Sequence, residues 1–95
     1  MNGAKTIHVI EENPSIADVL RIVLEGMGYS VTIVADVDEA QARAQSQLPD
    51  MALLDIDMNV QRGLEYVRWA KALQTEPFPI IVMSHDDETR RLGRT

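Results

Sequence analysis

The sequence predicts an α/β fold in which a parallel β-sheet is covered by helices on both faces. Short apolar runs typical of strands alternate with longer stretches typical of helices, at spacings of roughly 20 to 30 residues, as βαβ units require. The strand-like runs are almost continuously apolar, which is expected when helices bury a sheet from both sides. The chain has 95 residues, enough for one small domain with a single core.

The first strand is predicted at residues 6–10 (TIHVI), and it ends at Glu11 and Glu12. Asn13 can cap a helix, and Pro14 suits the first turn, where no backbone N–H is needed. Apolar residues then recur at helical spacing, with charged residues on the opposite side, and the glycines of EGMGY provide a left-handed cap. The apolar face comprises Ile16, Val19, Leu20, Val23, Leu24 and Met27.

The second strand is predicted at residues 30–34 (SVTIV). Asp36 followed by Glu39 forms the pattern of a capping box, which opens an alanine-rich helix that extends to about Gln47. Pro49 and the aspartate after it then end this unit.

The third strand is predicted at residues 51–55 (MALLD) and the fourth at residues 80–84 (IIVMS). A third helix follows Gly63, and the stretch EPFP separates it from the fourth strand. Residues 85–95 are short and polar and could begin one more helix. One side of the third helix carries Tyr66, Val67, Trp69, Ala70 and Leu73.

Composition excludes several classes of partner and site. The formal charge of −6 argues against nucleic acid or an anionic membrane as a direct partner, since both require basic patches. The sequence has no cysteine, which excludes disulfides and thiolate metal sites. No apolar run approaches membrane-spanning length and no signal region leads the chain, so a cytoplasmic location is expected.

Polar residues stand where three of the four predicted strands end. The first strand is followed by Glu11 and Glu12, the third ends in Asp55, and the fourth ends in Ser84. Ligands of open α/β sheets bind beyond the carboxyl ends of the strands. Because clustered carboxylates repel one another, such an edge favours a cation, and oxygen ligands of this kind suit Mg²⁺.

This pattern resembles the receiver domain of two-component response regulators, through VIEENPSIADVLRIVLEGMGYSV, PDMALLDIDM with GLEYVRWAK, and PIIVMS. The resemblance implies a flavodoxin-like (CheY-like) fold and a signalling domain, not an enzyme beyond self-phosphorylation and dephosphorylation. It implies that Asp55 accepts a phosphoryl group from a histidine kinase or phosphotransfer protein. It further implies that Glu11 and Glu12 bind Mg²⁺ together with Asp55 and the backbone carbonyl of Asp57, and that Ser84 contacts the phosphoryl group.

The chain departs from the family pattern around the proposed acceptor. Glu12 is one methylene longer than the aspartate usual there. The family's Met-Pro appears as Met58-Asn59, and its Asp-Gly appears as Arg62-Gly63. His85 stands where a small residue normally admits the phosphoryl group.

A fifth βα unit and its lysine are absent from these 95 residues. The two lysines of the sequence, Lys5 and Lys71, match no family position, and nothing in the sequence shows that Arg90, Arg91 or Arg94 replaces the missing one. Residues 1–95 are therefore expected to form a single receiver-like domain that is incomplete at its C-terminus. Without strand five the apolar fourth strand would be an exposed edge, which predicts a homodimer through that edge.

Alternative interpretations remain open. A pseudo-receiver would keep the fold and act as a protein-binding module without phosphorylation. The stretch DIDMN, beginning at Asp55, partly imitates the signature of haloacid-dehalogenase-type phosphatases, but it follows the third strand and lacks their later motifs. In simpler interpretations, Asp55 is a solvated strand end and His8 is a packed histidine of the first strand.

Overall fold

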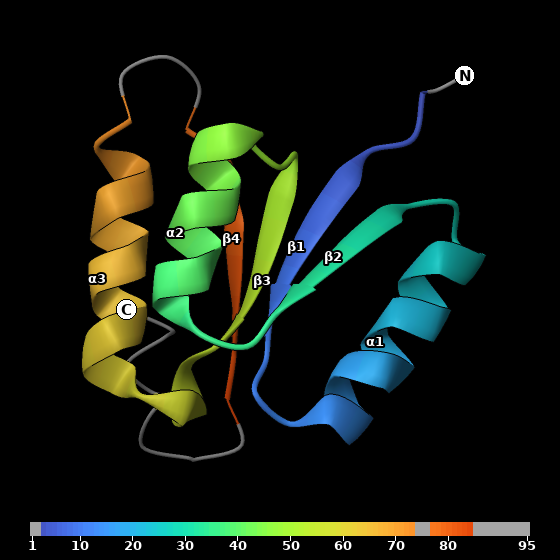
Figure 1. The fold of residues 1–95 in the computed structure, drawn as a ribbon, viewed down its shortest axis with the longest axis horizontal. Coiled ribbons are helices and arrows are strands. Elements are labelled where there is room, and N and C mark those ends of the chain that lie inside the picture. Colours follow the sequence, from blue (N-terminus) through green and yellow to red (C-terminus); the bar gives the residue numbers. More distant parts are fainter. Residues whose placement is uncertain (1–2, 74–76, 85–95) are drawn as a thin grey trace.

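The computed structural model describes residues 3–73 and 77–84 of the chain (Figure 1). The strands are β1 (Thr6–Ile10), β2 (Ser30–Val34), β3 (Met51–Asp55) and β4 (Ile80–Met83). The helices are α1 (Pro14–Gly26), α2 (Val37–Ser46) and α3 (Val60–Lys71), with a 3₁₀ turn, η1 (Ile56–Met58), after β3. This order confirms the predicted alternation of strands and helices.

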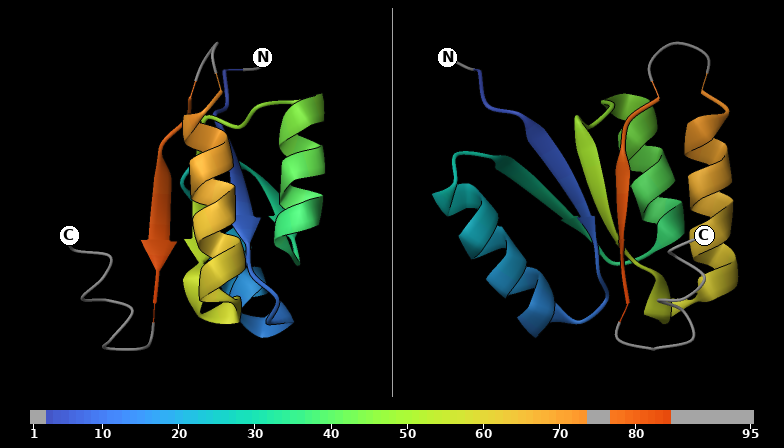
Figure 2. Two further views of the ribbon diagram at one scale, coloured as in Figure 1. Left: turned by 90° about the vertical axis from the view of Figure 1, so that its left-hand side faces the viewer. Right: turned by 180° about the vertical axis from the view of Figure 1, so that it is seen from behind.

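The four strands form one parallel sheet in the order β2-β1-β3-β4. Helices α2 and α3 lie on one face of this sheet and α1 lies on the other (Figure 2). The predicted three-layer α/β architecture is thereby confirmed. No helix in the described part of the chain is both long enough and apolar enough to cross a membrane.

Local capping fixes the starts of the helices. The Asn13 side chain accepts hydrogen bonds from the N–H groups of Ser15 (2.9 Å) and Ile16 (3.3 Å), as an N-cap does. Asp36 accepts from the N–H of Glu39 at 2.8 Å, and the Glu39 carboxylate accepts in return from the N–H of residue 35 at 3.3 Å. The predicted capping box therefore forms, with its return bond one residue earlier than the usual pattern.

One predicted helix start is wrong. Helix α3 begins at Val60, before Gly63, because the Asn59 side chain accepts a hydrogen bond from the N–H of Arg62 at 3.1 Å. Asn59 is therefore the N-cap of α3, in the position where the family has proline. The added turn brings Arg62 into the first turn of the helix.

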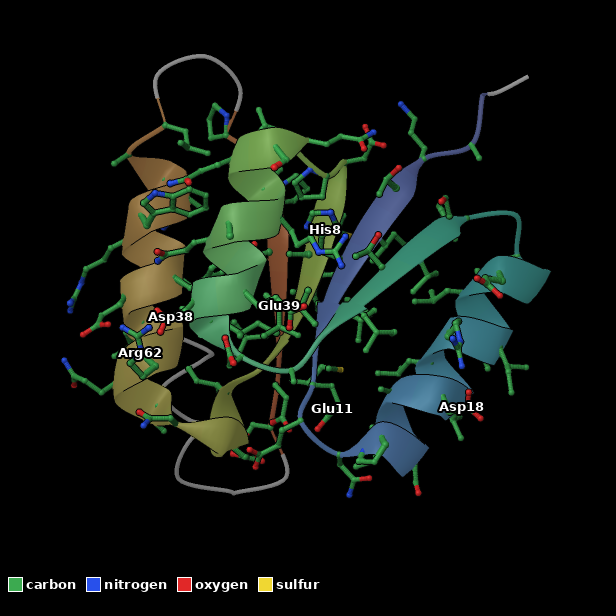
Figure 3. All side chains as sticks on the ribbon, viewed as in Figure 1. His8, Glu11, Asp18, Asp38, Glu39 and Arg62 are labelled. Atoms are coloured by element: carbon green, nitrogen blue, oxygen red, sulfur yellow. The ribbon has the colours of Figure 1, made fainter. Side chains whose placement is uncertain are left out.

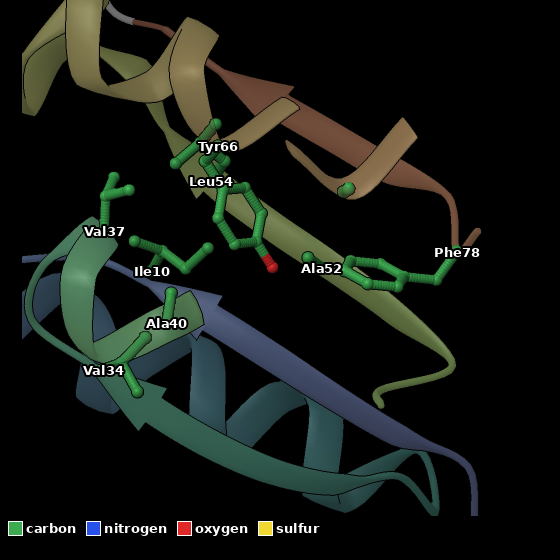
Figure 4. Packing of buried hydrophobic residues seen from close by; sticks show 9 residues of the cluster. Ile10, Val34, Val37, Ala40, Ala52, Leu54, Tyr66 and Phe78 are labelled. Carbon is green, nitrogen blue, oxygen red and sulfur yellow. The ribbon is translucent and has the colours of Figure 1, made fainter. Parts of the chain in front are cut away.

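Two apolar clusters hold the layers together. The cluster between the sheet and helices α2 and α3 is centred on the fully buried Tyr66 (Figure 4). The centroid of the Tyr66 ring lies 5.8 Å from that of Trp69 and 6.3 Å from that of Phe78. The cluster on the α1 side is smaller, with Ile7 and Val9 at its centre. The first cluster also contains Ile10, Val34, Val37, Ala40, Ala52, Leu54 and Ala70.

Apolar surface remains exposed on α1 and β4. Ile22 on α1 and Met27, the residue that caps the end of this helix, are 63% and 67% exposed, although the sequence pattern placed Met27 on the helix's apolar face. On β4, Ile81 and Val82 are 49% and 38% exposed. The expected exposure of the fourth strand is confirmed.

Two polar groups lie inside the structure without a hydrogen-bond partner among the described residues: Nδ1 of His8 and the hydroxyl of Tyr66. His8 is 3% exposed in the central strand β1, as the packed-histidine interpretation expected. Burial, and secondarily the charge of Arg43 on α2, lowers the pKa of His8. Burial raises the pKa of Tyr66 to about 12.

Candidate functional site

The register of the sheet brings the predicted site residues to one edge. Ile10 pairs with Leu54, so the residues that follow them, Glu11 and Asp55, stand at the same level of neighbouring strands. Asp55 pairs in turn with Met83 on β4, so Ser84 lies one residue beyond this level. The carboxyl ends of β1, β3 and β4 therefore share one edge, as the sequence predicted.

Asp55 lies at the end of β3 and is 7% exposed. Its Oδ1 atom accepts a hydrogen bond from the N–H of Asp57 at 3.0 Å, which turns the chain from the strand into η1. This bond fixes one carboxylate oxygen against the backbone. The same carboxylate lines a pocket, so the group is buried against protein on one side and accessible from the other.

The acidic pair after β1 divides into one buried and one exposed residue. Glu11 is 3% exposed, and its Oε2 atom accepts a hydrogen bond from the N–H of Asn13 at 3.0 Å, just before α1 (Figure 3). Glu12 is exposed and lines the same pocket as Asp55. Of the two glutamates, Glu12 is therefore the one that shares a pocket wall with the proposed acceptor.

Ser84 is linked to the loop after β3. Its hydroxyl donates a hydrogen bond to Oδ1 of Asp57 at 3.1 Å, between residues 27 positions apart in the sequence. Asp57 is exposed, as expected for a loop acid. The structure therefore brings Ser84 to the Asp55 edge through Asp57.

The pocket beside Asp55 has a volume of about 250 Å³ and lies between the end of β3, the start of α2 and the first turn of α3. At about 30 Å³ for each water molecule, it has room for a phosphoryl group and a hydrated ion, and it is small for a nucleotide. Its charged and polar lining residues are Glu12, Asp36, Asp38, Asp55, Asn59 and Arg62.

The donor set of this pocket fits a magnesium ion. Glu12 and Asp55 supply two carboxylates, and Mg²⁺ typically takes one or two from the protein and completes its shell with water and phosphate oxygens. No group of three or more acidic, histidine or cysteine side chains that could hold a metal occurs within residues 3–73 and 77–84. The pocket therefore suits a cation that binds together with phosphate better than an all-protein cage.

The structure adds one residue whose position the sequence could not show. The guanidinium of Arg62 donates to the carboxylates of Glu65, on its own helix, and Asp38, on α2 (Figure 3). The hydrogen bond with Glu65 and the charge of Asp38 raise the pKa of Arg62. Arg62 and Asp38 are 24 residues apart in the sequence, and the sequence pattern marked Arg62 only as a departure from the family's aspartate.

Two predicted features lie outside the described residues. The first is His85, expected near the entrance to the acceptor. The second is the group of arginines in the C-terminal stretch, Arg90, Arg91 and Arg94.

The chain is similar to known proteins over most of its length. The family model of the response regulator receiver domain matches residues 7–94 of the sequence. The phosphate regulon transcriptional regulatory protein PhoB of Rhizobium meliloti is 33% identical over 88 residues, which are 90% of this chain and 39% of PhoB. The alkaline phosphatase synthesis transcriptional regulatory protein PhoP of Bacillus subtilis is 32% identical over 84 residues, 88% of this chain and 35% of PhoP.

Among solved structures, the chemotaxis response regulator CheY4 of Vibrio cholerae superposes with a TM-score of 0.79 and 26% identity. The superposition covers 96% of this chain and 78% of that one. The chain thus spans a little over a third of the two curated relatives' length and most of a solved regulator.

Proposed function

Because the chain belongs to the response regulator receiver domain family of two-component systems, we propose that it is a phosphoacceptor switch with Asp55 as the acceptor. One observation carries the proposal. The Asp55 carboxylate lies at the end of an inner strand, 7% exposed, on the wall of a pocket that it shares with Glu12. A solvated strand end would be more exposed and would not line a pocket.

The proposed reaction is a phosphoryl transfer from a histidine kinase or phosphotransfer protein. A carboxylate oxygen of Asp55 attacks phosphorus, and the phosphorus–nitrogen bond of the donor's phosphohistidine breaks. The electron pair of that bond stays on the donor imidazole, and the product is an acyl phosphate on Asp55. Since Oδ1 is held by the N–H of Asp57, Oδ2 is the proposed nucleophile.

The residues proposed to hold Mg²⁺ are Glu12, Asp55 and the backbone carbonyl of Asp57. Glu11, the fourth expected ligand, is 3% exposed and is not among the residues that line this pocket. When bound, the cation offsets the charge of the transferring phosphoryl group. The hydroxyl of Ser84 is the proposed contact to a phosphoryl oxygen. That contact requires the hydroxyl to leave Oδ1 of Asp57, its partner at 3.1 Å.

Two further proposals concern partners. The printed names of PhoB and PhoP describe transcriptional regulators, and this chain matches 39% and 35% of their lengths. With a formal charge of −6, this domain is proposed not to contact nucleic acid itself. The exposed apolar edge of β4 is proposed to pair with a second copy of the chain.

A second candidate function is the phosphorylation-independent pseudo-receiver. The observation that favours it is the position of the lysines. Lys5 precedes β1 and Lys71 ends α3, at the edge of the sheet opposite Asp55. The described part of the chain therefore brings no lysine to the acceptor.

The test is incubation with Mg²⁺ and acetyl phosphate, followed by intact mass measurement over a short time course. The proposal expects one added phosphoryl group, its loss in Asp55→Asn, and its retention in the matched control Asp18→Asn, which changes an exposed acid on α1 away from the pocket. A folded protein that gains no mass at any time point would support the pseudo-receiver instead.

A further inference from the structure

The pocket beside Asp55 is strongly acidic, and its charge must be compensated before a phosphoryl group can enter. Its walls carry the acids Glu12, Asp36, Asp38 and Asp55, and a single base, Arg62. Transfer of a phosphoryl group replaces the single negative charge of the Asp55 carboxylate with about two on the acyl phosphate. One divalent cation therefore leaves the pocket short of positive charge, and a second cation is needed close to Asp55.

Arg62 is the base that the described part of the chain places on this pocket. The side chain of Asn59 fixes the backbone of Arg62 in the first turn of α3, and Arg62 follows Asp55 by seven residues in the sequence. Its side chain is 39% exposed, so the guanidinium can change partners without disturbing the core. A guanidinium suits this task because its fork of N–H donors matches phosphate oxygens.

The guanidinium donates through one nitrogen to Glu65 and through the other to Asp38. Asp38 is an exposed acid at the start of α2, with 84% of its side chain accessible, and it also lines the pocket. An ion pair with so exposed a partner is weak and easily exchanged. A phosphoryl group with two charges competes well against a single exposed carboxylate.

We propose that Arg62 is the cation that contacts the phosphoryl group on Asp55, and that it leaves Asp38 to do so. The inference rests on the proposed function, because it concerns the same acceptor. It assigns to Arg62, on α3, the contact to the phosphoryl group that the family pattern draws from a lysine. It also makes the Arg62–Asp38 pair a link between α2 and α3 that phosphorylation opens.

The test uses two variants that break the same ion pair from opposite sides. Arg62→Met removes the cation and is expected to slow phosphoryl uptake from acetyl phosphate about tenfold or more, the worth of one charge-assisted hydrogen bond. Asp38→Asn removes the competitor and is expected to accelerate uptake by roughly two- to fivefold. Arg62→Lys keeps the charge without the fork and should give an intermediate rate.

A purely structural ion pair predicts a different pattern. Both variants would then change stability and uptake in the same direction, and that result would overturn the inference. Arg21→Met is the matched control, since Arg21 pairs with Asp18 on α1, away from the pocket. It should leave the uptake rate unchanged.

The failure of this inference differs from failure of the proposed function. A wild type that accepts a phosphoryl group, with Arg62→Met equally fast, overturns only the role of Arg62. A wild type that never accepts one removes both. A second readout is the Arg62 side-chain N–H signal in nuclear magnetic resonance spectra with beryllofluoride, an acyl-phosphate mimic. The signal should shift on binding, and an unmoved signal would also overturn the role of Arg62.

Discussion

The N–H of Asp57 donates a hydrogen bond to Oδ1 of Asp55 at 3.0 Å. The backbone that follows β3 therefore binds the carboxylate of the last residue of that strand. The acceptor carboxylate is thus also the cap of the 3₁₀ turn η1. The two roles of Asp55 can be separated, because an asparagine keeps the oxygen acceptor for the turn but is not a nucleophile.

We therefore expect Asp55→Asn to abolish phosphoryl uptake while leaving the free energy of unfolding within about 0.5 kcal/mol of the wild type. Asp55→Ala should abolish uptake as well and also lower the free energy of unfolding by about 1 kcal/mol, because it removes the cap. Urea denaturation followed by circular dichroism measures both values. Equal stability of the two variants would show that the bond to Asp57 contributes nothing to folding.

The buried hydroxyl of Tyr66 leads to a second prediction. The residue is fully buried, and its hydroxyl finds no partner within the described residues. An unpartnered buried hydroxyl costs about 1–3 kcal/mol, so Tyr66→Phe should raise the free energy of unfolding by about 1 kcal/mol. Chemical denaturation at neutral pH tests this. A less stable variant would mean that the hydroxyl is hydrogen-bonded in solution.

The exposed edge of β4 leads to a third prediction. Val82 is 38% exposed on this edge, and lysine on an edge strand discourages pairing with another sheet. If two copies pair through β4, Val82→Lys should shift the protein from dimer to monomer in analytical ultracentrifugation. The matched control is Ile22→Lys, which introduces the same charge at an exposed apolar position on α1.

The control decides between two surfaces. An unchanged dimer in Val82→Lys together with a monomer in Ile22→Lys would assign the contact to α1 instead of β4. A monomeric wild type at every concentration would contradict the dimer.

The parts of the fold that depend on local chemistry could be predicted from the sequence. The cap at Asn13 and the capping box at Asp36 depend on residues two to four positions away, so their patterns are visible in the sequence. The shared edge of Glu11 and Asp55 could also be predicted. Parallel strands place their carboxyl ends together, so the residues that end each strand meet whatever the details of packing.

Features that depend on packing between distant elements could not be predicted. The bond between Arg62 and Asp38 requires α2 and α3 to lie side by side at a particular height. The periodicity of α1 predicted its apolar face but not how much of that face the sheet covers, and Met27 is 67% exposed. The start of α3 depends on one cap, the bond from the N–H of Arg62 to the Asn59 side chain, and the apolar periodicity that begins only after Gly63 does not indicate it.

The fourth prediction concerns His8, the histidine buried in β1. Burial, followed by the charge of Arg43, lowers its pKa below the ordinary value of 6.5, so it is neutral in the folded protein at neutral pH. In the unfolded chain the imidazole takes up a proton near pH 6.5. Between that pH and the lower folded pKa, the unfolded state binds more protons, so the stability must decrease as the pH falls.

We expect the free energy of unfolding to be independent of His8 protonation above about pH 7. Below pH 6.5 it should fall by at most about 1.4 kcal/mol for each pH unit, which is the limit for one proton. His8→Leu removes the titrating group and keeps an apolar side chain in the strand. Urea denaturation at several pH values between 7.5 and 5.5 should therefore give a difference between variant and wild type that grows as the pH falls. A difference that stays constant over this range would contradict the prediction. It would mean that His8 has the same pKa in the folded and unfolded states, and therefore that it reaches solvent in the folded protein.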